Sequence, residues 1–309
     1  MKIAVLYGGI SGEREVSLST GKGIIKALEY NGHDVSGIDF HPEQIHEILD
    51  LDVDIVFIGL HGKHGEDGRI QGLLDMLGVP YVGSGVLASS LAMDKSKAKQ
   101  IFHQNGLQTA QSISLPVQSG KNPQTMVEEV KQALTLPLVI KPNQEGSTLG
   151  LTIVKTEDQL LPAIKEAIKC DSVILAEEYV VGREVTVAVM GTQGNEKALP
   201  VIEIIPKNDY YDYESKYTPG GSEHVCPAEV SKDITTILQR DAVLAHQLLG
   251  CNTYSRVDFI ISNDGKPIIL EVNTLPGMTP TSLFPDAANV MGMSYEQMVE
   301  EFVCISLQD

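Results

Sequence analysis

The sequence lacks the long apolar runs and paired cysteines that mark several classes of protein. No stretch approaches eighteen uninterrupted apolar residues, and the first apolar run breaks at Gly8, too early for the core of a signal peptide. The four cysteines (Cys170, Cys226, Cys251 and Cys304) include no C-x-x-C pair, so we expect ordinary reduced thiols. We therefore expect a soluble protein of the cytoplasm.

Positive charge is also scarce. The chain has 23 Lys and Arg against 41 Asp and Glu, a net charge of -18. This balance argues against a general nucleic-acid binder or a binder of anionic membranes, whose affinity comes from Lys and Arg. If the protein binds a phosphate-bearing ligand, a few residues at one site must hold the phosphate, because the overall charge of the chain repels it. The 309 residues, 42% of them hydrophobic, can bury a sizeable core and predict two or three domains.

The first ninety residues alternate short apolar runs with helical patterns. The runs cover residues 3–7, 35–38, 55–60 and 79–82, and the helical patterns cover 16–28, 43–50 and 69–77. This alternation predicts a doubly wound α/β domain, in which ligands bind beyond the carboxyl ends of the strands. Gly8-Gly9, His61-Gly62 and Gly83-Ser84-Gly85 fall at such ends. The segment GGISGE does not match G-x-G-x-x-G, so no dinucleotide site is predicted.

Two residues of this region have two interpretations each. Glu13 stands at the start of a helix, where it could compensate the helix dipole or capture a substrate ammonium group. His61 could make structural hydrogen bonds or contact a substrate.

The central region contains a second informative stretch, LPLVIKPNQEGSTLGL. A β-branched strand ends in Lys141, and the following turn, 145–150, is small and rich in hydroxyl groups. Its backbone N–H groups could fold over phosphate oxygens, although a surface β-turn is the alternative. The turn is not a Walker A loop, because no Gly-Lys-Ser/Thr closes it. Helices are expected at 94–104, 123–134 and 157–169, and strands at 112–115, 173–177 and 185–189.

The pattern stops after a strand at 198–204. Residues 205–227 include four tyrosines, mixed charges and a Gly-Gly turn but no periodicity. A loop of this length inside a compact domain is usually a lid or disordered, and the Tyr and Lys content favours a lid. A helix at 232–249 follows, and helices near 283–291 and 294–307 end the chain.

Two apolar runs, 257–261 and 267–270, flank Asp264-Gly265, a strong hairpin signal. The hairpin places Asp258 near the start of one strand and Glu271 and Asn273 on one face at the end of the other. Such oxygen ligands suit Mg²⁺. A polar sheet edge is the alternative, but the nearby Arg256 and the Gly- and Pro-containing loop after Glu271 favour a phosphate–metal site.

Several motifs together resemble the D-alanine:D-alanine ligase family of the ATP-grasp superfamily. They are GGISGEREVSLSTG, LHGKHGEDG, GSGVLASSLAMDK, KPNQEGSTLG, YDYESKY, SRVDF and EVNTLPGMTPTSL, in order along essentially the whole chain. The resemblance implies an N-terminal α/β substrate-binding domain (1–95), a central ATP-grasp subdomain (96–182) and a C-terminal one (183–309). ATP would lie between the last two. The implied reaction joins two D-alanines for peptidoglycan synthesis and forms ADP and phosphate through a D-alanyl phosphate.

The same resemblance implies roles for individual residues. Two Mg²⁺ ions, with Mn²⁺ as a substitute, would be held by Asp258, Glu271 and Asn273. ATP would be contacted by Lys95, Lys141, Ser147, Glu177, Glu178, Tyr179, Val180 and Glu184. The first D-alanine would be bound by Glu13 with His61, and Ser147 and Tyr217 would tie Glu13 to the lid. Arg256 and the Gly277 amide would form an oxyanion hole, and the second D-alanine would be received by Lys216, Ser282 and Leu283. A homodimer is the family expectation.

The chain departs from the family pattern at two places. Glu177-Glu178 stands where many relatives have Glu-Lys, which affects how the adenine edge is read. Tyr217, rather than Phe, favours the dipeptide over a D-alanyl-D-lactate ester. The sequence also leaves open a different ATP-grasp carboxylate–amine ligase and a non-catalytic nucleotide-binding or scaffold protein. The base that deprotonates the attacking amine is not evident from the sequence.

Overall fold

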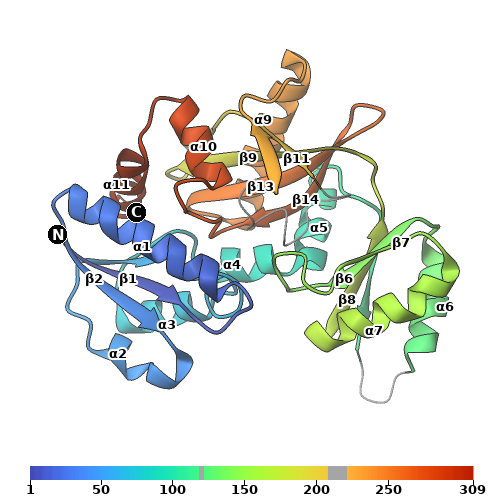
Figure 1. Ribbon diagram of the computed structural model, residues 1–309, viewed down its shortest axis with the longest axis horizontal. Helices are drawn as coiled ribbons and strands as arrows, with labels where there is room; N and C mark the ends of the chain where they lie inside the picture. Colours follow the sequence, from blue (N-terminus) through green and yellow to red (C-terminus); the bar gives the residue numbers. More distant parts are fainter. Residues whose placement is uncertain (118–121, 208–220, 309) are drawn as a thin grey trace.

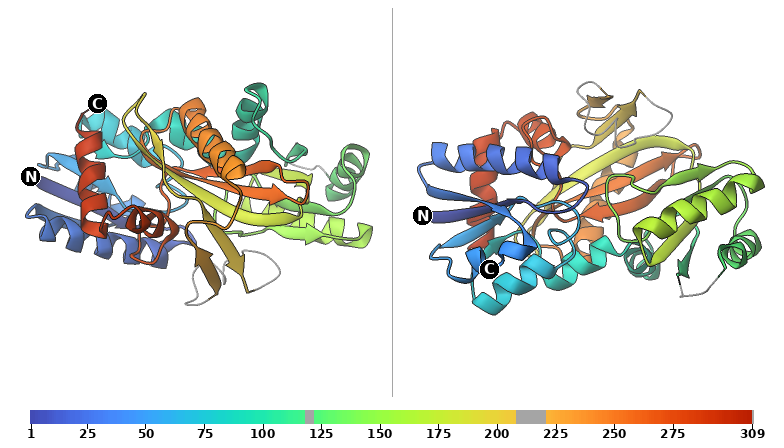
Figure 2. Two further views of the ribbon diagram at one scale, coloured as in Figure 1. Left: turned by 90° about the horizontal axis from the view of Figure 1, so that it is seen from above. Right: turned by 60° about the horizontal axis from the view of Figure 1, so that its bottom comes forward.

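The computed structural model describes residues 1–117, 122–207 and 221–308, which form three β-sheets with helices packed around them (Figure 1). The first sheet is parallel, with strand order β2-β1-β3-β4. The strands are β1 (Lys2–Gly8), β2 (Asp34–Phe40), β3 (Ile55–Ile58) and β4 (Tyr81–Val82). Helices α1 (Arg14–Tyr30) and α3 (Arg69–Leu77) lie on opposite faces of this sheet (Figures 1 and 2). The predicted α/β arrangement is confirmed.

The strand order reverses between β1 and β3, which makes their carboxyl ends the expected ligand crevice. The chain leaves β1 through Gly8 and Gly9, with φ of +86° and +77°. A Cβ at Gly8 would lie 2.0 Å from Oδ1 of Asp39, so this turn needs glycine for space as well as for its backbone angle. His61 follows β3 at the same edge, as the sequence predicts.

One helix of this region differs from expectation. The stretch 43–50 forms a short 3₁₀ turn, Pro42–Gln44, and a single α-helical turn, α2 (His46–Leu49). Ile48 is the one buried residue of the two pieces, so little packing stabilises a longer helix here.

The second sheet is antiparallel, with order β5-β8-β6-β7. Its strands are β5 (Ser112–Pro116), β6 (Leu138–Pro142), β7 (Thr152–Val154) and β8 (Val173–Glu178). Helices α6 (Pro123–Ala133) and α7 (Leu160–Cys170) bury their apolar stripes against it, and a 3₁₀ turn (Glu157–Gln159) leads into α7. The other face of this sheet is left for the site described below.

The third sheet is antiparallel, with order β12-β11-β9-β13-β14, and β10 pairs with β9. Its strands are β9 (Gly182–Gly191), β10 (Lys197–Ala198), β11 (Ile202–Pro206), β12 (Ser222–Val225), β13 (Thr253–Ser262) and β14 (Pro267–Asn273). Helix α9 (Lys232–Leu249) packs against β9, β13 and β14. The strand expected at 198–204 is split around Pro200, which has no N–H to donate to a sheet.

The long aperiodic segment at 205–227 is partly regular. Residues 205 and 206 belong to β11, and residues 222–225 form β12, which pairs with β11. The expectation of an irregular loop is therefore wrong for these two ends. Cross-strand pairing supplies the order, and a local sequence pattern cannot report it. Residues 208–220 lie outside the described residues.

Four further helices pack against the sheets or against α9. Helices α4 (Val86–Met93) and α5 (Lys95–Gln104) pack against β14 and α9, while α10 (Leu283–Val290) and α11 (Tyr295–Ser306) return to the core of the first sheet. Asp94 caps α5 by accepting a hydrogen bond from the Lys97 N–H. The domain boundaries near residues 95 and 182 stay a prediction.

The cysteines are free thiols, as expected, and burial raises the pKa of Cys226 to about 11 and that of Cys251 to about 12. Among the described helices, none has both the length and the apolar composition needed to cross a membrane.

Acid should destabilise the fold through His246. Its ring lies fully buried in α9, with Nδ1 2.7 Å from Oγ of Ser255, and burial lowers its pKa to about 4. The unfolded chain takes up this proton near pH 6.5, whereas the folded chain does so only near pH 4. Between these pH values protonation therefore stabilises the unfolded state relative to the folded state. We expect His246 to remove about 2 kcal/mol of unfolding free energy between pH 7 and pH 5.

Urea unfolding at the two pH values measures this loss. His246→Gln should be less pH-sensitive than the unsubstituted chain by that amount, whereas the exposed His103→Gln should match the unsubstituted chain. An unchanged pH dependence in His246→Gln would contradict the assignment.

Candidate active site

The β13–β14 hairpin brings the predicted phosphate–metal residues together. Asp258 is paired with Glu271, and Arg256 with Asn273. A bulge follows Asp258, and this residue lies in the middle of β13. The expectation that it stands near the start of the strand is wrong, because β13 begins at Thr253, well before the apolar run that the sequence shows. Asp258 still lies on the strand paired with Glu271 and Asn273, as the hairpin predicts.

Asp258 is fixed by hydrogen bonds from three side chains. Arg256 donates from Nε to Oδ1 at 2.9 Å and from Nη2 to Oδ2 at 2.8 Å. Asn273 donates to Oδ2 at 2.9 Å, and Thr186 on the neighbouring strand β9 donates to Oδ1 at 2.6 Å. Because a bidentate pair holds both groups in one plane, the orientation of the guanidinium is set as well.

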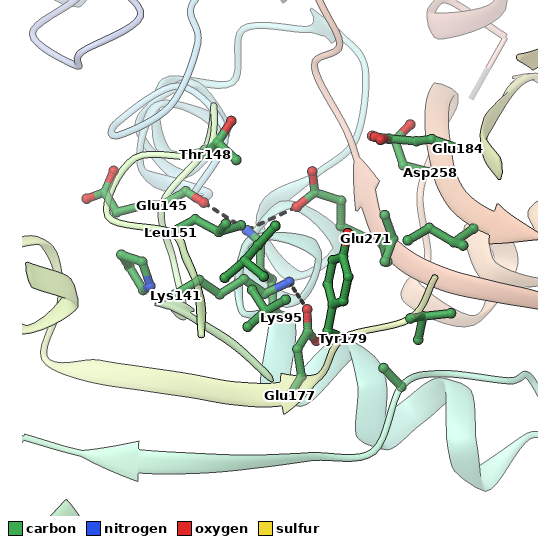
Figure 3. Close-up of a pocket in the computed structure, with 18 of the residues that line it drawn as sticks. Lys95, Lys141, Glu145, Thr148, Leu151, Glu177, Tyr179, Glu184, Asp258 and Glu271 are labelled. Carbon is green, nitrogen blue, oxygen red and sulfur yellow. Dashed lines mark hydrogen bonds and ion pairs between the residues drawn. The ribbon is translucent and has the colours of Figure 1, made fainter. Parts of the chain in front are cut away.

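Glu271 faces a lysine that comes from a distant element. Nζ of Lys95, at the start of α5, lies 3.2 Å from Oε2 of Glu271 and donates to the carbonyl oxygen of Glu145 at 2.8 Å (Figure 3). Burial opposes the charge of Lys95, but Glu271 outweighs it, so the pKa of this lysine is raised. The charged ammonium group of Lys95 is thus held beside Glu271, near the C-terminal end of β14.

A cleft of about 970 Å³, partly open to solvent, lies between the second and third sheets. Its apolar walls include Val139, Leu151, Ile153, Ile260 and Leu270. A flat aromatic base fits such walls, and the charged end lies at Lys95 and Glu271. All eight residues predicted to contact the nucleotide line this cleft, namely Lys95, Lys141, Ser147, Glu177, Glu178, Tyr179, Val180 and Glu184.

The hydroxyl-rich turn covers one side of the cleft. Ser147 and Thr148 have positive φ, +49° and +62°, and are followed by Gly150 at +69°. Turns of this kind can present backbone N–H groups to an anion. The N–H groups of Leu149 and Leu151 bond to the carbonyl oxygens of Gly146 and Thr148 within the turn. Within the described part of the chain, the buried Oγ1 of Thr148 has no hydrogen-bond partner, which leaves a polar group on the cleft wall for a ligand.

A second cleft adjoins the first and shares Gly146, Ser147 and Glu271 with it. It contains every described residue that was predicted to bind the amino acids or to act in catalysis, namely Glu13, His61, Ser147, Arg256, Gly277, Ser282 and Leu283. Asn273 also lines it. Lys216 and Tyr217 lie outside the described residues. The shared residues join the two clefts beside Glu271, near the C-terminal end of β14 and away from the Asp264-Gly265 turn.

Glu13 joins the first sheet to the phosphate-side turn. It is buried, it precedes α1 without a side-chain cap, and its carboxylate accepts a hydrogen bond from Ser147. The contact links residues 134 positions apart. A surface carboxylate that merely balanced the helix dipole would not need this partner.

His61 is held from both sides of its ring. Nε2 lies 2.9 Å from Oγ1 of Thr20, and Nδ1 lies 3.1 Å from the carbonyl oxygen of Leu275. Burial opposes protonation, but the nearby carboxylate of Glu66 outweighs it, so the pKa of His61 is raised. Burial also raises the pKa of Glu66, which accepts a hydrogen bond from the Gly62 N–H at 3.0 Å. Sequence reasoning did not select Glu66 or Thr20.

The loop after β14 ends at the start of α10. Ser282 is the N-cap residue of this helix, and its Oγ accepts a hydrogen bond from the Thr279 N–H at 3.1 Å. Gly277 lies beside it, since a Cβ there would be 3.2 Å from the same oxygen. Backbone N–H groups at a helix start suit a carboxylate.

The donor set fits a divalent cation. Across the described ranges, no group of three or more His, Cys, Asp or Glu side chains could hold a metal. The predicted set differs, because it combines two carboxylates with one amide, and it opens onto both clefts through Glu271. A few oxygen ligands beside space for phosphate are what Mg²⁺ takes. By residue type, Asp258, Glu271 and Asn273 fit Mg²⁺, while the two oxygens of Asp258 here accept hydrogen bonds from Arg256, Asn273 and Thr186.

Comparisons with known proteins show which family the chain resembles. Residues 101–304 match the family model "D-ala D-ala ligase C-terminus", and residues 43–84 match "D-ala D-ala ligase N-terminus". The chain is 59% identical to a D-alanine--D-alanine ligase of Halalkalibacterium halodurans, over 100% of both proteins. It is 44% identical to one from Carboxydothermus hydrogenoformans, over 100% of the chain and 99% of the relative.

Solved structures show the same likeness. A D-alanine--D-alanine ligase from Bacillus anthracis complexed with ATP superposes with a TM-score of 0.85 at 32% identity, over 100% of this chain and 98% of that one. The VanG D-Ala:D-Ser ligase from Enterococcus faecalis also reaches 0.85, at 31% identity, over 99% of each chain.

Proposed function

The chain belongs to the D-alanine–D-alanine ligase family, and we propose that its two continuous clefts divide the work of this ATP-dependent enzyme. The cleft between the second and third sheets takes ATP, and the cleft between the first and third sheets takes both amino acids. The observation that carries this proposal is the sharing of Ser147 and Glu271 by the two clefts. The terminal phosphate of ATP and a bound carboxylate would meet there.

The chemistry needs such a meeting point. A carboxylate is a poor acyl donor, so the first D-alanine attacks the γ-phosphorus and displaces ADP. The resulting D-alanyl phosphate is attacked by the free amine of the second D-alanine. The tetrahedral intermediate then expels inorganic phosphate, and the amine loses its extra proton. Each step builds negative charge that fixed donors can stabilise.

In the nucleotide cleft, Lys95 and Lys141 bind the phosphates and the turn at 145–150 folds over them. Residues 177–180, at the end of β8 and just after it, line the adenine, and Glu184 receives the ribose hydroxyls. Lys95 already lies at the junction through its contact with Glu271. These two lysines supply positive charge for the phosphates within an acidic chain.

In the amino-acid cleft, Glu13 binds the ammonium group of the first D-alanine, and His61 supports this end of the site. Arg256 and the Gly277 N–H stabilise the tetrahedral oxyanion, with Arg256 kept in its plane by Asp258. Ser282 and Leu283, at the start of α10, receive the carboxylate of the second D-alanine. The roles that the family resemblance gives to Lys216 and Tyr217 stay predictions.

Asp258, Glu271 and Asn273 would hold two Mg²⁺ ions, for which Mn²⁺ is a substitute. When bound, such ions neutralise charge on the phosphates of ATP and polarise the transferred group. Thr186 and Arg256 fix the carboxylate of Asp258 so that its oxygens stay at the junction. We further propose that the protein acts in the cytoplasm as a homodimer that supplies peptidoglycan synthesis.

The most useful test is ADP formation with D-alanine as the only amino acid, with and without Mg²⁺. We expect one ADP per dipeptide with Mg²⁺ and almost none after the metal is removed. Release of phosphate with L-alanine but not D-alanine would point to another carboxylate–amine ligase. Offering D-alanine together with D-lactate or D-serine at neutral pH tests the product, and a dominant ester or a dominant D-alanyl-D-serine would reject the dipeptide D-alanyl-D-alanine.

A further inference from the structure

A buried cluster of charges lies behind the nucleotide cleft. Glu177 at the end of β8 has one lysine at each carboxylate oxygen: Lys141 of β6 donates a hydrogen bond to Oε1, and Nζ of Lys99 lies 3.0 Å from Oε2. The side chains of Lys99 and Glu177 are 5% and 4% exposed. The cluster therefore places two lysines at one carboxylate, away from water. Burial lowers the pKa of Lys99, and the carboxylate of Glu177 opposes this effect.

The two lysines are not equivalent. Lys141 and Glu177 line the nucleotide cleft, whereas Lys99 reaches Glu177 from helix α5 and is absent from the cleft wall. Lys141 is hydrogen-bonded to the carboxylate (Figure 3). Lys99 is within ion-pair distance, but neither its Nζ nor Oε2 has an aligned hydrogen bond among the described residues. Lys141 therefore lies on the cleft wall, where it can contact a ligand, whereas Lys99 contacts Glu177 from behind the cleft wall.

The pairing matters because a buried charge without a partner is costly. Glu177 is ionised, since Lys141 and Lys99 outweigh burial and lower its pKa to about 2. If Lys141 turns toward a phosphate, its hydrogen bond to Glu177 weakens. With Lys99 in place the carboxylate keeps a counter-charge and can rotate into line with it. Without Lys99, the carboxylate of Glu177 would keep Lys141 as its only counter-charge, and Lys141 would bind a phosphate less readily.

We infer that Lys99 is a positioning residue for ATP: it balances Glu177 so that Lys141 can leave the carboxylate and bind the nucleotide phosphates. This inference rests on the proposed role of Lys141. It assigns Lys99 no contact with ATP or with D-alanine. Its effect passes through Glu177 and Lys141, and it concerns ATP affinity rather than the chemical steps.

A double-mutant cycle tests the inference on the full chain. The dissociation constant of ATP with Mg²⁺ is measured by calorimetry, without D-alanine, for the unsubstituted chain, Lys99→Met, Glu177→Gln and the double variant. We expect Lys99→Met to weaken ATP binding about tenfold, and the same substitution to change it less than about threefold when residue 177 is already Gln. At saturating ATP, kcat of Lys99→Met should stay within about threefold of the starting value.

Lys97→Met is the matched control, because Lys97 is an exposed lysine of the same helix, and it should bind ATP like the unsubstituted chain. Should Lys99→Met not fold, Lys99→Gln is measured by the same criterion. Unchanged ATP affinity in the variant at residue 99, or equal weakening in both backgrounds, would overturn the inference. Absence of D-alanine-dependent ADP formation by the unsubstituted chain would instead reject the proposed function, because the binding cycle does not involve D-alanine.

Discussion

Replacing Glu271 by Gln should lower the rate of dipeptide formation by about a hundredfold or more. Glu271 lies at the junction of the two clefts, opposite Asp258 in the hairpin and 3.2 Å from Lys95. The amide keeps the shape of the side chain but removes the negative charge that would bind Mg²⁺ and hold Lys95. We expect both kcat and the affinity for Mg²⁺ to fall.

Steady-state ADP formation and a calorimetric Mg²⁺ titration in the presence of ADP measure these two effects. Glu157→Gln is a suitable control, since Glu157 makes an exposed ion pair with Lys131 and lines neither cleft. Unchanged turnover in Glu271→Gln would refute the metal assignment. Loss of turnover with unchanged Mg²⁺ affinity would restrict Glu271 to its contact with Lys95.

Arg256→Lys should also lower kcat by about a hundredfold while leaving ATP affinity unchanged. The substitution keeps the positive charge, but an ammonium group cannot make the two parallel hydrogen bonds by which Arg256 binds Asp258. The donor that faces the tetrahedral oxyanion would then lose its fixed orientation. An interaction made mainly in the transition state appears in kcat.

The matched control is Arg183→Lys. Arg183 on β9 makes a similar two-pronged contact with Glu203, but at the exposed side of the sheet. We expect this variant to retain its rate. Equal losses in both variants would indicate a general effect of the sheet, and a normal rate in Arg256→Lys would remove Arg256 from the oxyanion site.

Local patterns predicted the elements that carry most of the site. The Asp-Gly turn predicted the hairpin. The pairing of Asp258 with Glu271 depends in addition on the bulge after Asp258, because the register of Phe259 with Ile269 would otherwise place Leu270 opposite Asp258. The glycines after β1 likewise predicted the ligand edge of the first sheet. Strand β12 escaped prediction because its pairing with β11 crosses a long stretch of chain and leaves no periodicity.

The missed residues share a physical reason. Thr186, Glu66 and Lys99 act on residues that the sequence did identify, and they reach them through tertiary contacts: Thr186 to Asp258, Glu66 to His61 and Lys99 to Glu177. Nothing in the local sequence of a strand threonine or a helix lysine reports such a partner. The family resemblance supplied roles for some residues in the motifs, but none for Glu66, which lies within LHGKHGEDG, and Lys99 lies outside the motifs.

The central claim is that the γ-phosphate of ATP meets the carboxylate of D-alanine where the two clefts join. Isotopic labelling tests it directly: D-alanine carrying ¹⁸O in its carboxylate is converted to dipeptide in unlabelled water, and the released phosphate is analysed by mass spectrometry. The account predicts one ¹⁸O atom in the phosphate for each dipeptide formed, because the attacking oxygen leaves with phosphorus. Unlabelled phosphate alongside normal dipeptide formation would show that the carboxylate never attacks the nucleotide and would contradict the account.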